Sequence, residues 1–450
     1  MSKRFFPAVS TFSLKGKLLV GMIRIFGFAL PLFYGRKPRK NFEENPAYYS
    51  WRDILYFAYK YYLHPPETAE SEQLVRYFQT MQFAFPEGVE ETHHLTLSTG
   101  GDLMPYAWMT RENSSSLWDE IGDWYFNNDV VFANLETPID LTKPASAVPE
   151  VMLNDMHFNG NSALFDLFSG FEKFKGYDVL STANNHSLDM EIEGIDRTID
   201  FLQSKNILQV GTVKNSEDQF KPAIIEKNGI RLAFVAATYC LNHLELPENE
   251  LYRINTGRFN LPEADISLIH KLVDEARKQA DFVILSLHNG NAYQAYPSEH
   301  TVANVHRIFE ECGPDLILGS HPHNPQPIEQ YPFICPFTGE EKKGIAVYSQ
   351  GDFVAYDIFT WCHLHLGIRF RISRFKDDKV RISRMEVMPQ YLWHGDQKNG
   401  FDFRFLPLLN CEKYLPKMSN RSKMEYQEIL RFWKTHLAPS LSSFATAAIP

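Results

Sequence analysis

Residues 179 to 189 read Val-Leu-Ser-Thr-Ala-Asn-Asn-His-Ser-Leu-Asp, an apolar run that changes abruptly into polar side chains able to bind metal. The pattern predicts a buried strand that ends before Asn184, Asn185 and His186, followed by a helix over residues 190–205. Open α/β sheets hold their binding sites at the carboxyl ends of such strands. On its own the stretch is equally compatible with a turn, in which the Asn residues tolerate left-handed backbone and His186 caps the helix.

The same pattern of a short apolar run followed by polar side chains recurs along the chain. Such runs precede Asp102, Glu136, His288, and the pair His321 and His323. Gly100 and Gly101 are expected to let the backbone turn tightly, so that Asp102 points into the site. Each residue alone has an ordinary alternative, such as a turn for Asp102 or a surface ion pair for Glu136. Together they form a mixed oxygen and nitrogen set that suits one or two divalent transition ions. Helical spacing between the runs completes the alternation that an α/β layered core requires.

The composition is that of a globular protein and restricts the classes of partner. Of 450 residues, 44% are hydrophobic and 22% charged, which argues against wholesale disorder. The length allows one large core with additions or two domains, and the periodicity favours one large core. The formal charge of −10 argues against nucleic acid as a partner, because binding phosphates needs a basic face and none is evident. An anionic substrate would then be met locally, by metal. The five cysteines are widely scattered and predict reduced core residues.

Familiar catalytic motifs of other hydrolases and kinases do not occur. The chain has no G-x-S-x-G, no G-x-x-x-x-G-K-[ST] and no H-E-x-x-H. These absences disfavour serine hydrolases, P-loop kinases and zincins. The functions that remain are metal-assisted hydrolysis and metal-assisted binding of a ligand without reaction.

The amino-terminal part is expected to be an extension of the main domain. Residues 18–35 are almost wholly apolar, with Arg24 and Pro31 inside the run and basic residues on both sides, including residues 36–40. An anchor lying at a membrane interface fits this better than a spanning helix or a cleaved signal peptide. The alternative is an amphipathic helix packed on the protein's own surface. Helical spacing over residues 51–63 and 71–83 predicts two further helices.

Six short motifs support a family resemblance when they are taken in order. They are Gly-Asp-Leu-Met (101 to 104), Ala-Asn-Leu-Glu-Thr-Pro (133 to 138), Ala-Asn-Asn-His-Ser-Leu-Asp (183 to 189), His-Asn-Gly-Asn-Ala-Tyr (288 to 293), Gly-Ser-His-Pro-His (319 to 323) and Tyr-Ser-Gln-Gly-Asp-Phe (348 to 353). The set resembles the CapA family of poly-γ-glutamate capsule synthesis proteins, which belongs with the calcineurin-like metallophosphoesterases. The resemblance covers about residues 93–390. It divides the chain into an extension (1–92), a CapA-like domain (93–394) and a carboxyl-terminal extension (395–450).

The resemblance implies a four-layer α-β-β-α sandwich with one or two divalent ions, Mn, Zn or Fe, at the strand ends. Asp102 and His323 would hold one ion, and Glu136 would bridge to the other. Asn185, His288 and His321 would hold that second ion. His186 would act as general acid or charge stabiliser, oriented by Asp189.

Several positions depart from the motifs of the family. Met104 stands where members of the wider superfamily usually carry a His ligand, a loss that CapA-like sequences share and that implies a weak or absent first ion. Asn289 and Ala292 replace a usual Trp and Glu, and Gln350 and Asp352 replace a usual Leu and Asn. Such substitutions are expected near the substrate. The residues expected to contact substrate are Asn184, Asn289, Tyr293 and Asp352.

Two functional hypotheses follow. In the first, metal-activated water attacks a phosphoester, a phosphoanhydride or a γ-glutamyl amide bond. The substrate would be an anionic polymer or a phosphoester. In the second, the protein is a non-catalytic, membrane-associated component of capsule or polymer assembly, which binds a polyanion or one structural ion beside other assembly proteins. The expected location is membrane-associated or cytoplasmic, with the side of the membrane open.

Overall fold

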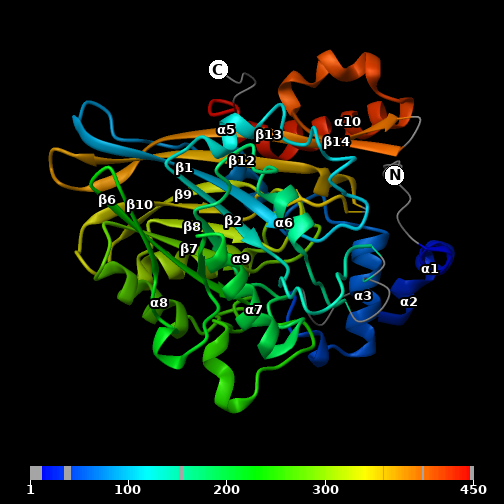
Figure 1. The fold of residues 1–450 in the computed structure, drawn as a ribbon, viewed down its shortest axis with the longest axis horizontal. Helices are drawn as coiled ribbons and strands as arrows, with labels where there is room; N and C mark the ends of the chain where they lie inside the picture. Colours follow the sequence, from blue (N-terminus) through cyan, green and yellow to red (C-terminus); the bar gives the residue numbers. More distant parts are fainter. Residues whose placement is uncertain are drawn as a thin grey trace.

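Two β-sheets packed face to face form the centre of the molecule, as the computed structural model shows in Figure 1. The structure describes residues 13–34, 42–149, 151, 156–357, 359–397 and 400–445. The strands are β1 (Glu91–Leu103), β2 (Val130–Leu135), β3 (Val179–Ser181), β4 (Leu208–Val210), β5 (Ala223–Lys227), β6 (Ile230–Thr238), β7 (Phe282–His288), β8 (Leu316–Ser320), β9 (Ile328–Ile334), β10 (Glu341–Val347), β11 (Asp352–Val354), β12 (Leu364–Phe375), β13 (Val380–Gln397) and β14 (Gly400–Pro407).

The eight-stranded sheet has the order β14-β13-β12-β1-β2-β3-β4, with β11 paired to β1. The six-stranded sheet has the order β5-β6-β7-β8-β10-β9. The strands β1 to β4 run parallel to one another, and so do β6, β7, β8 and β10. All residues of β2 and β7 are buried, as expected for parallel strands covered on both faces.

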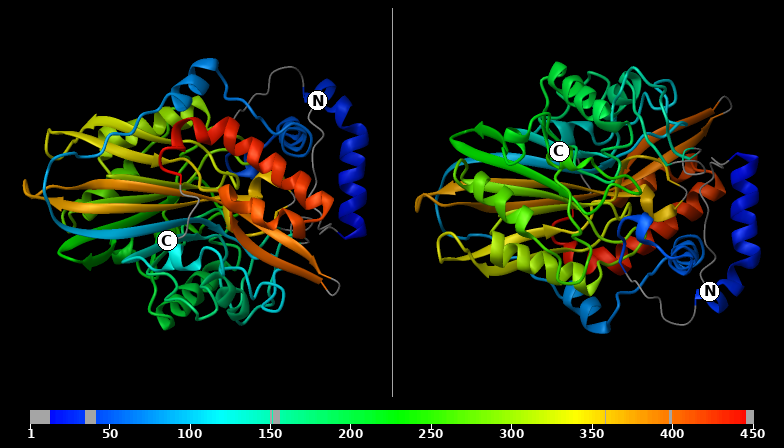
Figure 2. Two further views of the ribbon diagram at one scale, coloured as in Figure 1. Left: turned by 90° about the horizontal axis from the view of Figure 1, so that it is seen from above. Right: turned by 90° about the horizontal axis from the view of Figure 1, so that it is seen from below.

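Helices cover the outer face of each sheet and complete the four expected layers (Figure 2). The helices are α1 (Leu14–Phe26), α2 (Leu30–Tyr34), α3 (Trp51–Tyr62), α4 (Glu72–Gln79), α5 (Gly122–Phe126), α6 (Ser162–Phe168), α7 (Glu191–Ser204), α8 (Ser267–Arg277), α9 (Glu299–Arg307), α10 (Asn420–Phe432) and α11 (Ala438–Leu441). The apolar side of α8 packs on the six-stranded sheet, and α6 and α7 pack on the eight-stranded sheet. Between the sheets, the rings of Phe132 and Phe234 stack with centroids 5.5 Å apart.

The carboxyl-terminal strands extend the same sheet that contains β1. β12 pairs antiparallel with β1, and β13 pairs with both β12 and β14. β13 runs without interruption through the expected boundary at residue 394, and α10 packs against it. Residues 400–432 are therefore packed on the main domain.

The amino-terminal helices α1 and α2 lie at one side of the molecule and touch it through α3 (Figures 1 and 2). The side chains of Leu14, Leu18, Ile25 and Leu32 are more than half exposed. Within the described residues, none of the helices combines the length and apolarity that crossing a bilayer requires. The basic residues 36–40 lie outside the described part of the chain.

Two local expectations are corrected or supported by the packing. Gly100 and Gly101 do not form a tight turn, because β1 continues through both to Leu103. A Cβ atom at Gly101 would lie 1.8 Å from the carbonyl oxygen of Gly351, so the glycine permits close approach of the β11 segment. All five cysteines are buried and unpaired, as the scattered spacing predicted.

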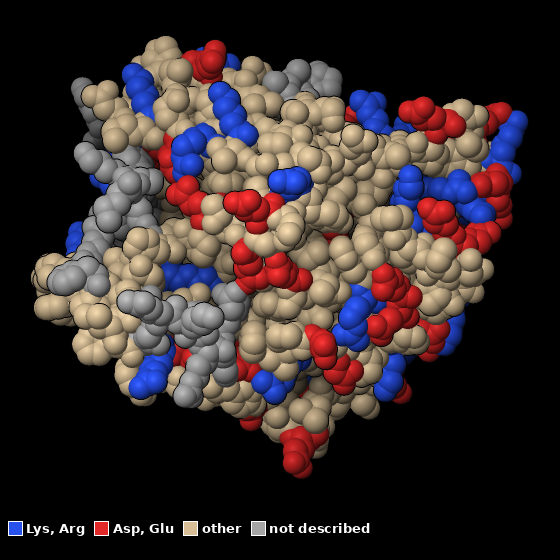
Figure 3. Space-filling view, turned by 180° about the vertical axis from the view of Figure 1, so that it is seen from behind, with Lys and Arg blue, Asp and Glu red and all other residues tan. Residues whose placement is uncertain are grey.

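The charged side chains are mixed on the face of the molecule shown in Figure 3. There, basic and acidic side chains are interspersed among uncharged ones.

Candidate metal centre

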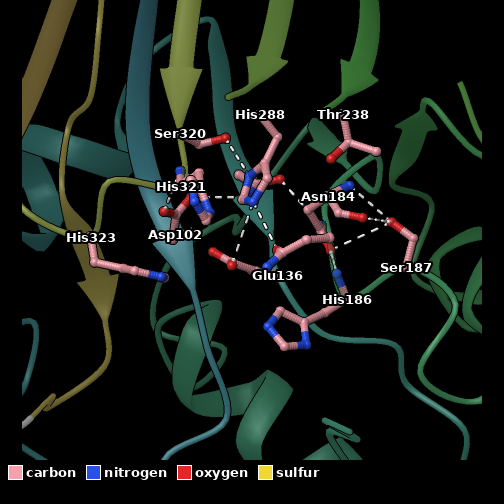
Figure 4. A network of polar contacts seen from close by, with 12 residues as sticks. Asp102, Glu136, Asn184, His186, Ser187, Thr238, His288, Ser320, His321 and His323 are labelled. Carbon is pink, nitrogen blue, oxygen red and sulfur yellow. Dashed lines mark hydrogen bonds and ion pairs between the residues drawn. The ribbon is translucent and has the colours of Figure 1, made fainter. Parts of the chain in front are cut away.

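The carboxyl ends of parallel strands from both sheets meet at one edge and bring five candidate ligands together (Figure 4). Asp102 lies next to the last residue of β1, Glu136 follows β2, and His288 ends β7. His321 and His323 follow β8. Their ligand atoms form overlapping groups, each within 4.8 Å: Glu136, His321 and His323; Asp102, Glu136 and His288; and Asp102, His323 and Asp352.

Glu136 lies at the middle of this cluster and has no exposed surface. Among the described residues, neither of its carboxylate oxygens has a hydrogen-bond partner. Burial and the nearby Asp102 raise the pKa of Glu136 well above its usual value. A buried carboxylate without hydrogen bonds is costly, and a bound cation removes that cost.

Asp102 and His288 are each held by neighbouring polar side chains. Nδ2 of Asn134 donates to Oδ1 of Asp102 at 2.8 Å, and the backbone N–H of His321 donates to Oδ2 at 3.1 Å. Nδ1 of His288 lies 2.8 Å from Oγ of Ser320, and Nε2 lies 2.9 Å from Oδ1 of Asn185. Burial lowers the pKa of His288 well below its usual value, which favours the neutral form that binds metal.

The His321-Pro322-His323 segment has an unusual backbone. His321 has a φ of 97° and His323 a φ of 61°, in the region that residues with a Cβ seldom occupy. The two rings have centroids 5.7 Å apart, and the His321 and His288 rings are 5.1 Å apart. Such strain persists where the surroundings hold it and is typical of functional sites.

His186 and Asp189 form a pair at the wall of a cavity beside the cluster. Nδ1 of His186 donates to Oδ2 of Asp189 at 2.6 Å, and the backbone N–H of Phe158 donates to the same oxygen at 2.6 Å. The Phe158 ring stacks on the His186 ring with centroids 3.7 Å apart. This contact fixes the direction of the His186 ring, and the orienting role of Asp189 in catalysis stays a prediction.

The cavity has a volume of about 260 Å³ and includes His186, His321 and His323 in its wall. Val148, Pro149, Met156 and Phe158, which follow strand β2 in the chain, also contribute to the wall. The amino-terminal extension contributes Glu43, Glu44, Pro46, Tyr49, Phe57 and Tyr61.

Glu43 is the site residue that sequence reasoning missed. Its Oε2 lies 2.8 Å from Nε2 of His321, although the two residues are 278 positions apart. Burial raises the pKa of Glu43, but His321 and Lys60 more than offset this and lower it to about 2. No strand precedes Glu43 in the described part of the chain, so the pattern that identified the other candidates does not reach it.

Of the four residues expected to contact substrate, Tyr293 lines the cavity, and the other three have polar contacts within the protein. Tyr293 lines the cavity, and its hydroxyl donates to Oδ2 of Asp357 at 3.2 Å. Asn184 turns its Nδ2 inward to donate to the Leu135 carbonyl at 2.8 Å, and Oδ1 of Asp352 lies 2.9 Å from Nδ1 of His323. The backbone N–H of Asn289 donates to the carbonyl of Ser320, and its side chain is buried.

The donor set fits a divalent transition ion. Carboxylates, imidazoles and an amide oxygen converge, and several of their atoms have no hydrogen-bond partner in the described residues: both oxygens of Glu136, Nδ1 of His321 and Oδ2 of Asp352. Nε2 of His288 lies 3.6 Å from Oε1 of Glu136. Cations bound to these overlapping groups would give the atoms partners.

Comparison with known proteins gives matches over more than half of the chain. Residues 96–357 match the family described as "Bacterial capsule synthesis protein PGA_cap". The "PGA biosynthesis protein CapA" of Bacillus subtilis (strain 168) is 24% identical over 242 residues, which are 53% of this chain and 60% of that protein. The "Capsule biosynthesis protein CapA" of Bacillus anthracis is 25% identical over 281 residues, 61% of this chain and 63% of that protein. The matched region thus spans less than two thirds of either relative.

Solved structures show weak similarity. A hypothetical protein from Thermus thermophilus has a TM-score of 0.35 and 16% identity, covering 65% of this chain and 99% of that chain. The NAD nucleotidase NadN of Haemophilus influenzae has a TM-score of 0.38 and 12% identity, covering 76% of this chain and 64% of that one.

Proposed function

This chain belongs to the bacterial capsule synthesis protein family PGA_cap, and from that premise we propose that it is a metal-dependent hydrolase of capsule polymer synthesis. The proposed reaction is cleavage of a phosphoester or a γ-glutamyl amide. One observation carries the proposal. The cluster around Glu136, which includes buried ligand atoms with no hydrogen-bond partner among the described residues, adjoins the same cavity as His186, whose ring pairs with Asp189.

In this proposal the ligands act as the resemblance implies, with one or two ions of Mn, Zn or Fe. Asp102 and His323 would hold one ion, Asn185, His288 and His321 would hold the second, and Glu136 would bridge them. When bound, such an ion polarises a substrate oxygen and makes water easier to deprotonate.

His186 is assigned the role of proton donor to the leaving group. Its Nδ1–H is held by Asp189, so the proton to be transferred is the one on Nε2. The carboxylate of Asp189 stabilises the charged imidazole, and the stacked Phe158 ring fixes its plane. General acid catalysis of this kind contributes about 10²- to 10⁴-fold to rate.

The cavity limits the size of the reacting group. Its volume of about 260 Å³ is suited to one monomer-sized unit and not to several units of a polymer. We therefore expect the reacting group to be the end of a polymer or a small phosphoester. Attraction of an anionic group would come from the bound ion, because Glu43, Glu44 and Asp357 in the wall are acidic.

The test is a hydrolysis assay on the full chain loaded with Mn, Zn or Fe. Aryl phosphates, phosphodiesters and γ-glutamyl anilides serve as probes, and His186→Ala is compared with His306→Ala. His306 pairs with Glu329 at 3.0 Å outside the candidate centre, so its loss controls for a general change in folding. Metal-dependent turnover that falls at least ~10²-fold only in the His186 variant supports the proposal. Absence of turnover in the metal-loaded wild type on every probe contradicts it.

A second candidate function is association with a membrane surface as part of an assembly complex. The exposed Leu14, Leu18, Ile25 and Leu32 lie on α1 and α2 together with the exposed Lys15 and Lys17. Apolar and basic side chains on one short helical segment favour an interface rich in anionic lipid. Cosedimentation with vesicles of phosphatidylglycerol, lost in the variant Leu18→Asp with Ile25→Asp, would support this function. Equal sedimentation of wild type and variant would contradict it.

A further inference from the structure

We infer that Glu43 is a positioning residue of the metal centre, which fixes the His321 ring through Nε2 so that Nδ1 is the nitrogen that binds metal. The inference rests on the proposed metal-dependent function and extends it to a residue outside the matched region of residues 96–357.

The carboxylate of Glu43 is surrounded by hydrogen-bond donors. Its Oε1 accepts from the backbone N–H of Ala292 at 2.7 Å and from the hydroxyl of Tyr61. Its Oε2 lies 2.8 Å from Nε2 of His321 and 3.5 Å from the hydroxyl of Tyr239. The Tyr239 hydroxyl also lies 3.1 Å from Nε2 of His321. Because a carboxylate only accepts, Nε2 of His321 donates to Glu43, and the Tyr239 oxygen lies close enough to accept from the same N–H while its own proton points to Oε2.

This hydrogen bond decides which nitrogen of His321 is available. A neutral imidazole with its proton on Nε2 carries a lone pair on Nδ1. Nδ1 is buried and, within the described residues, has no hydrogen-bond partner. His321 also belongs to a group of potential ligands with Glu136 and His323. A carboxylate bound to the second nitrogen of a ligating His is a common means of fixing its orientation and raising its basicity.

The centre contains a second pair of the same kind. Nδ1 of His323 lies 2.9 Å from Oδ1 of Asp352, which leaves Nε2 of His323 as the other ring nitrogen. The two histidines of the His-Pro-His segment are thus each held by a buried carboxylate from a different part of the chain.

The segment that carries Glu43 is firmly docked. The backbone N–H of Glu43 donates to Oδ1 of Asn291 at 2.9 Å. Helix α3 begins with a capping box between Ser50 and Asp53 and places Tyr61 against Tyr293, with ring centroids 5.3 Å apart. Residues 42–62, here termed the strap, are therefore held on the main domain through both the backbone and the side chain of Glu43.

The neighbouring Glu44 provides a matched control. It is buried, lines the same cavity and pairs with Arg258 at 2.5 Å. It belongs to none of the groups of potential metal ligands found among the described residues. Replacing Glu44 by Gln changes the strap by one charge and leaves the His321 contact in place.

The experiment measures Mn²⁺ and Zn²⁺ affinity by calorimetry for wild type, Glu43→Gln, Tyr61→Phe and Glu44→Gln. Urea unfolding in EDTA is measured for the same proteins. We expect Glu43→Gln to weaken metal binding by about 10- to 100-fold, the usual effect of losing such a partner. Tyr61→Phe, which removes one donor to Glu43, is expected to give a smaller loss. Glu44→Gln is expected to bind metal as the wild type does, whatever its effect on unfolding.

Each contrary outcome has a distinct meaning. Unchanged affinity in Glu43→Gln, with metal bound normally by the wild type, overturns the positioning role alone. Increased affinity also overturns it, because Glu43 would then compete with metal for Nε2 of His321. Failure of the wild type to bind either ion overturns the proposed centre and this inference together.

Discussion

Asp102 and Asp352 are direct neighbours across the parallel pair β1 and β11, so the last ligand-bearing position of β1 faces a second buried carboxylate. Burial raises the pKa of Asp352 to about 7, although His323 lowers it, and Asp102 adds to the rise. The Coulombic effect of Asp352 and Glu136 raises the pKa of His323 well above its usual value, against the opposing effect of burial. The candidate centre therefore gathers several buried carboxyl groups around His323.

The first prediction concerns the His323 and Asp352 pair. Asp352→Asn removes the charge that holds Nδ1 of His323 and is expected to weaken metal binding by about 10- to 100-fold. Calorimetric titration with Mn²⁺ measures this. Glu329→Gln is the control, because Glu329 is a buried partner of His306 outside the centre. Equal affinities in the two variants would show that Asp352 has no role in orienting His323.

The second prediction concerns Glu136 and pH. Because its pKa is raised in the folded protein, the metal-free protein keeps a proton that the unfolded chain loses above about pH 4.5. The free energy of unfolding in EDTA should therefore fall as pH rises from about 5 to 8, by up to about 1.4 kcal/mol per pH unit from this group. Urea unfolding of wild type and Glu136→Gln measures the difference.

The side chain introduced by Glu136→Gln cannot ionise, so the free energy of unfolding of this variant should fall less steeply between about pH 5 and 8. Added Mn²⁺ should restore the wild type at high pH and have little effect on the variant, which lacks the bridging carboxylate. Parallel pH curves for the two metal-free proteins would mean that Glu136 does not carry the raised pKa.

The third prediction separates orientation of His186 from substrate binding. In Asp189→Asn the Nδ1 partner of His186 loses its charge, and the imidazolium form is no longer stabilised. We expect kcat to fall by about 10- to 100-fold or more with little change in KM, because the pair acts in the transition state. Steady-state kinetics on the best probe substrate tests this. A rise in KM at constant kcat would assign the pair to substrate binding.

Much of the fold was predictable because strands and helices depend on local apolar spacing. The runs ending at Asp102, Glu136 and His288 are strands β1, β2 and β7, and the predicted helix over residues 190–205 is α7 (Glu191–Ser204). Parallel strands share the direction of their carboxyl ends, so their polar ends could be expected to meet. The four-layer arrangement agrees with this expectation.

The other features of the fold and of the candidate site depend on contacts between residues that are distant in sequence. The approach of Glu43 to His321 is set by docking of the strap on Asn291 and Ala292, which no local pattern records. Gly100 and Gly101 were expected to turn the chain, but the need for close approach to Gly351 is visible only in three dimensions. Ala292 is a position where the motif departs from the family. Its backbone N–H donates a hydrogen bond to Glu43, and no side chain in the sequence could indicate that contact.

The fourth prediction concerns acid stability away from the centre. His365 is fully buried, its ring stacks on Phe353 at 4.2 Å, and burial lowers its pKa from 6.5 to about 3. The folded protein must leave this ring neutral while the unfolded chain protonates it below about pH 6.5, so stability is lost as pH falls from about 6.5 toward 3. Between about pH 6.5 and 5.0 this amounts to about 2 kcal/mol.

His365→Gln removes that titration, so its loss of stability between about pH 7.5 and 5.0 should be smaller than that of the wild type by about 2 kcal/mol. Urea unfolding at the two pH values measures the difference, even where the variant is less stable at both. Identical losses would show that His365 titrates normally in the folded protein.

Elemental analysis of the full chain decides whether the strand-end residues hold metal. The protein is purified without added metal, and wild type, His321→Ala and His306→Ala are compared before and after incubation with Mn²⁺ or Zn²⁺ and removal of free ions. We predict about one or two transition ions per chain in the wild type and in His306→Ala, and a clear loss in His321→Ala. Metal-free wild type after both incubations, or equal metal in all three proteins, would contradict a metal centre built on His321.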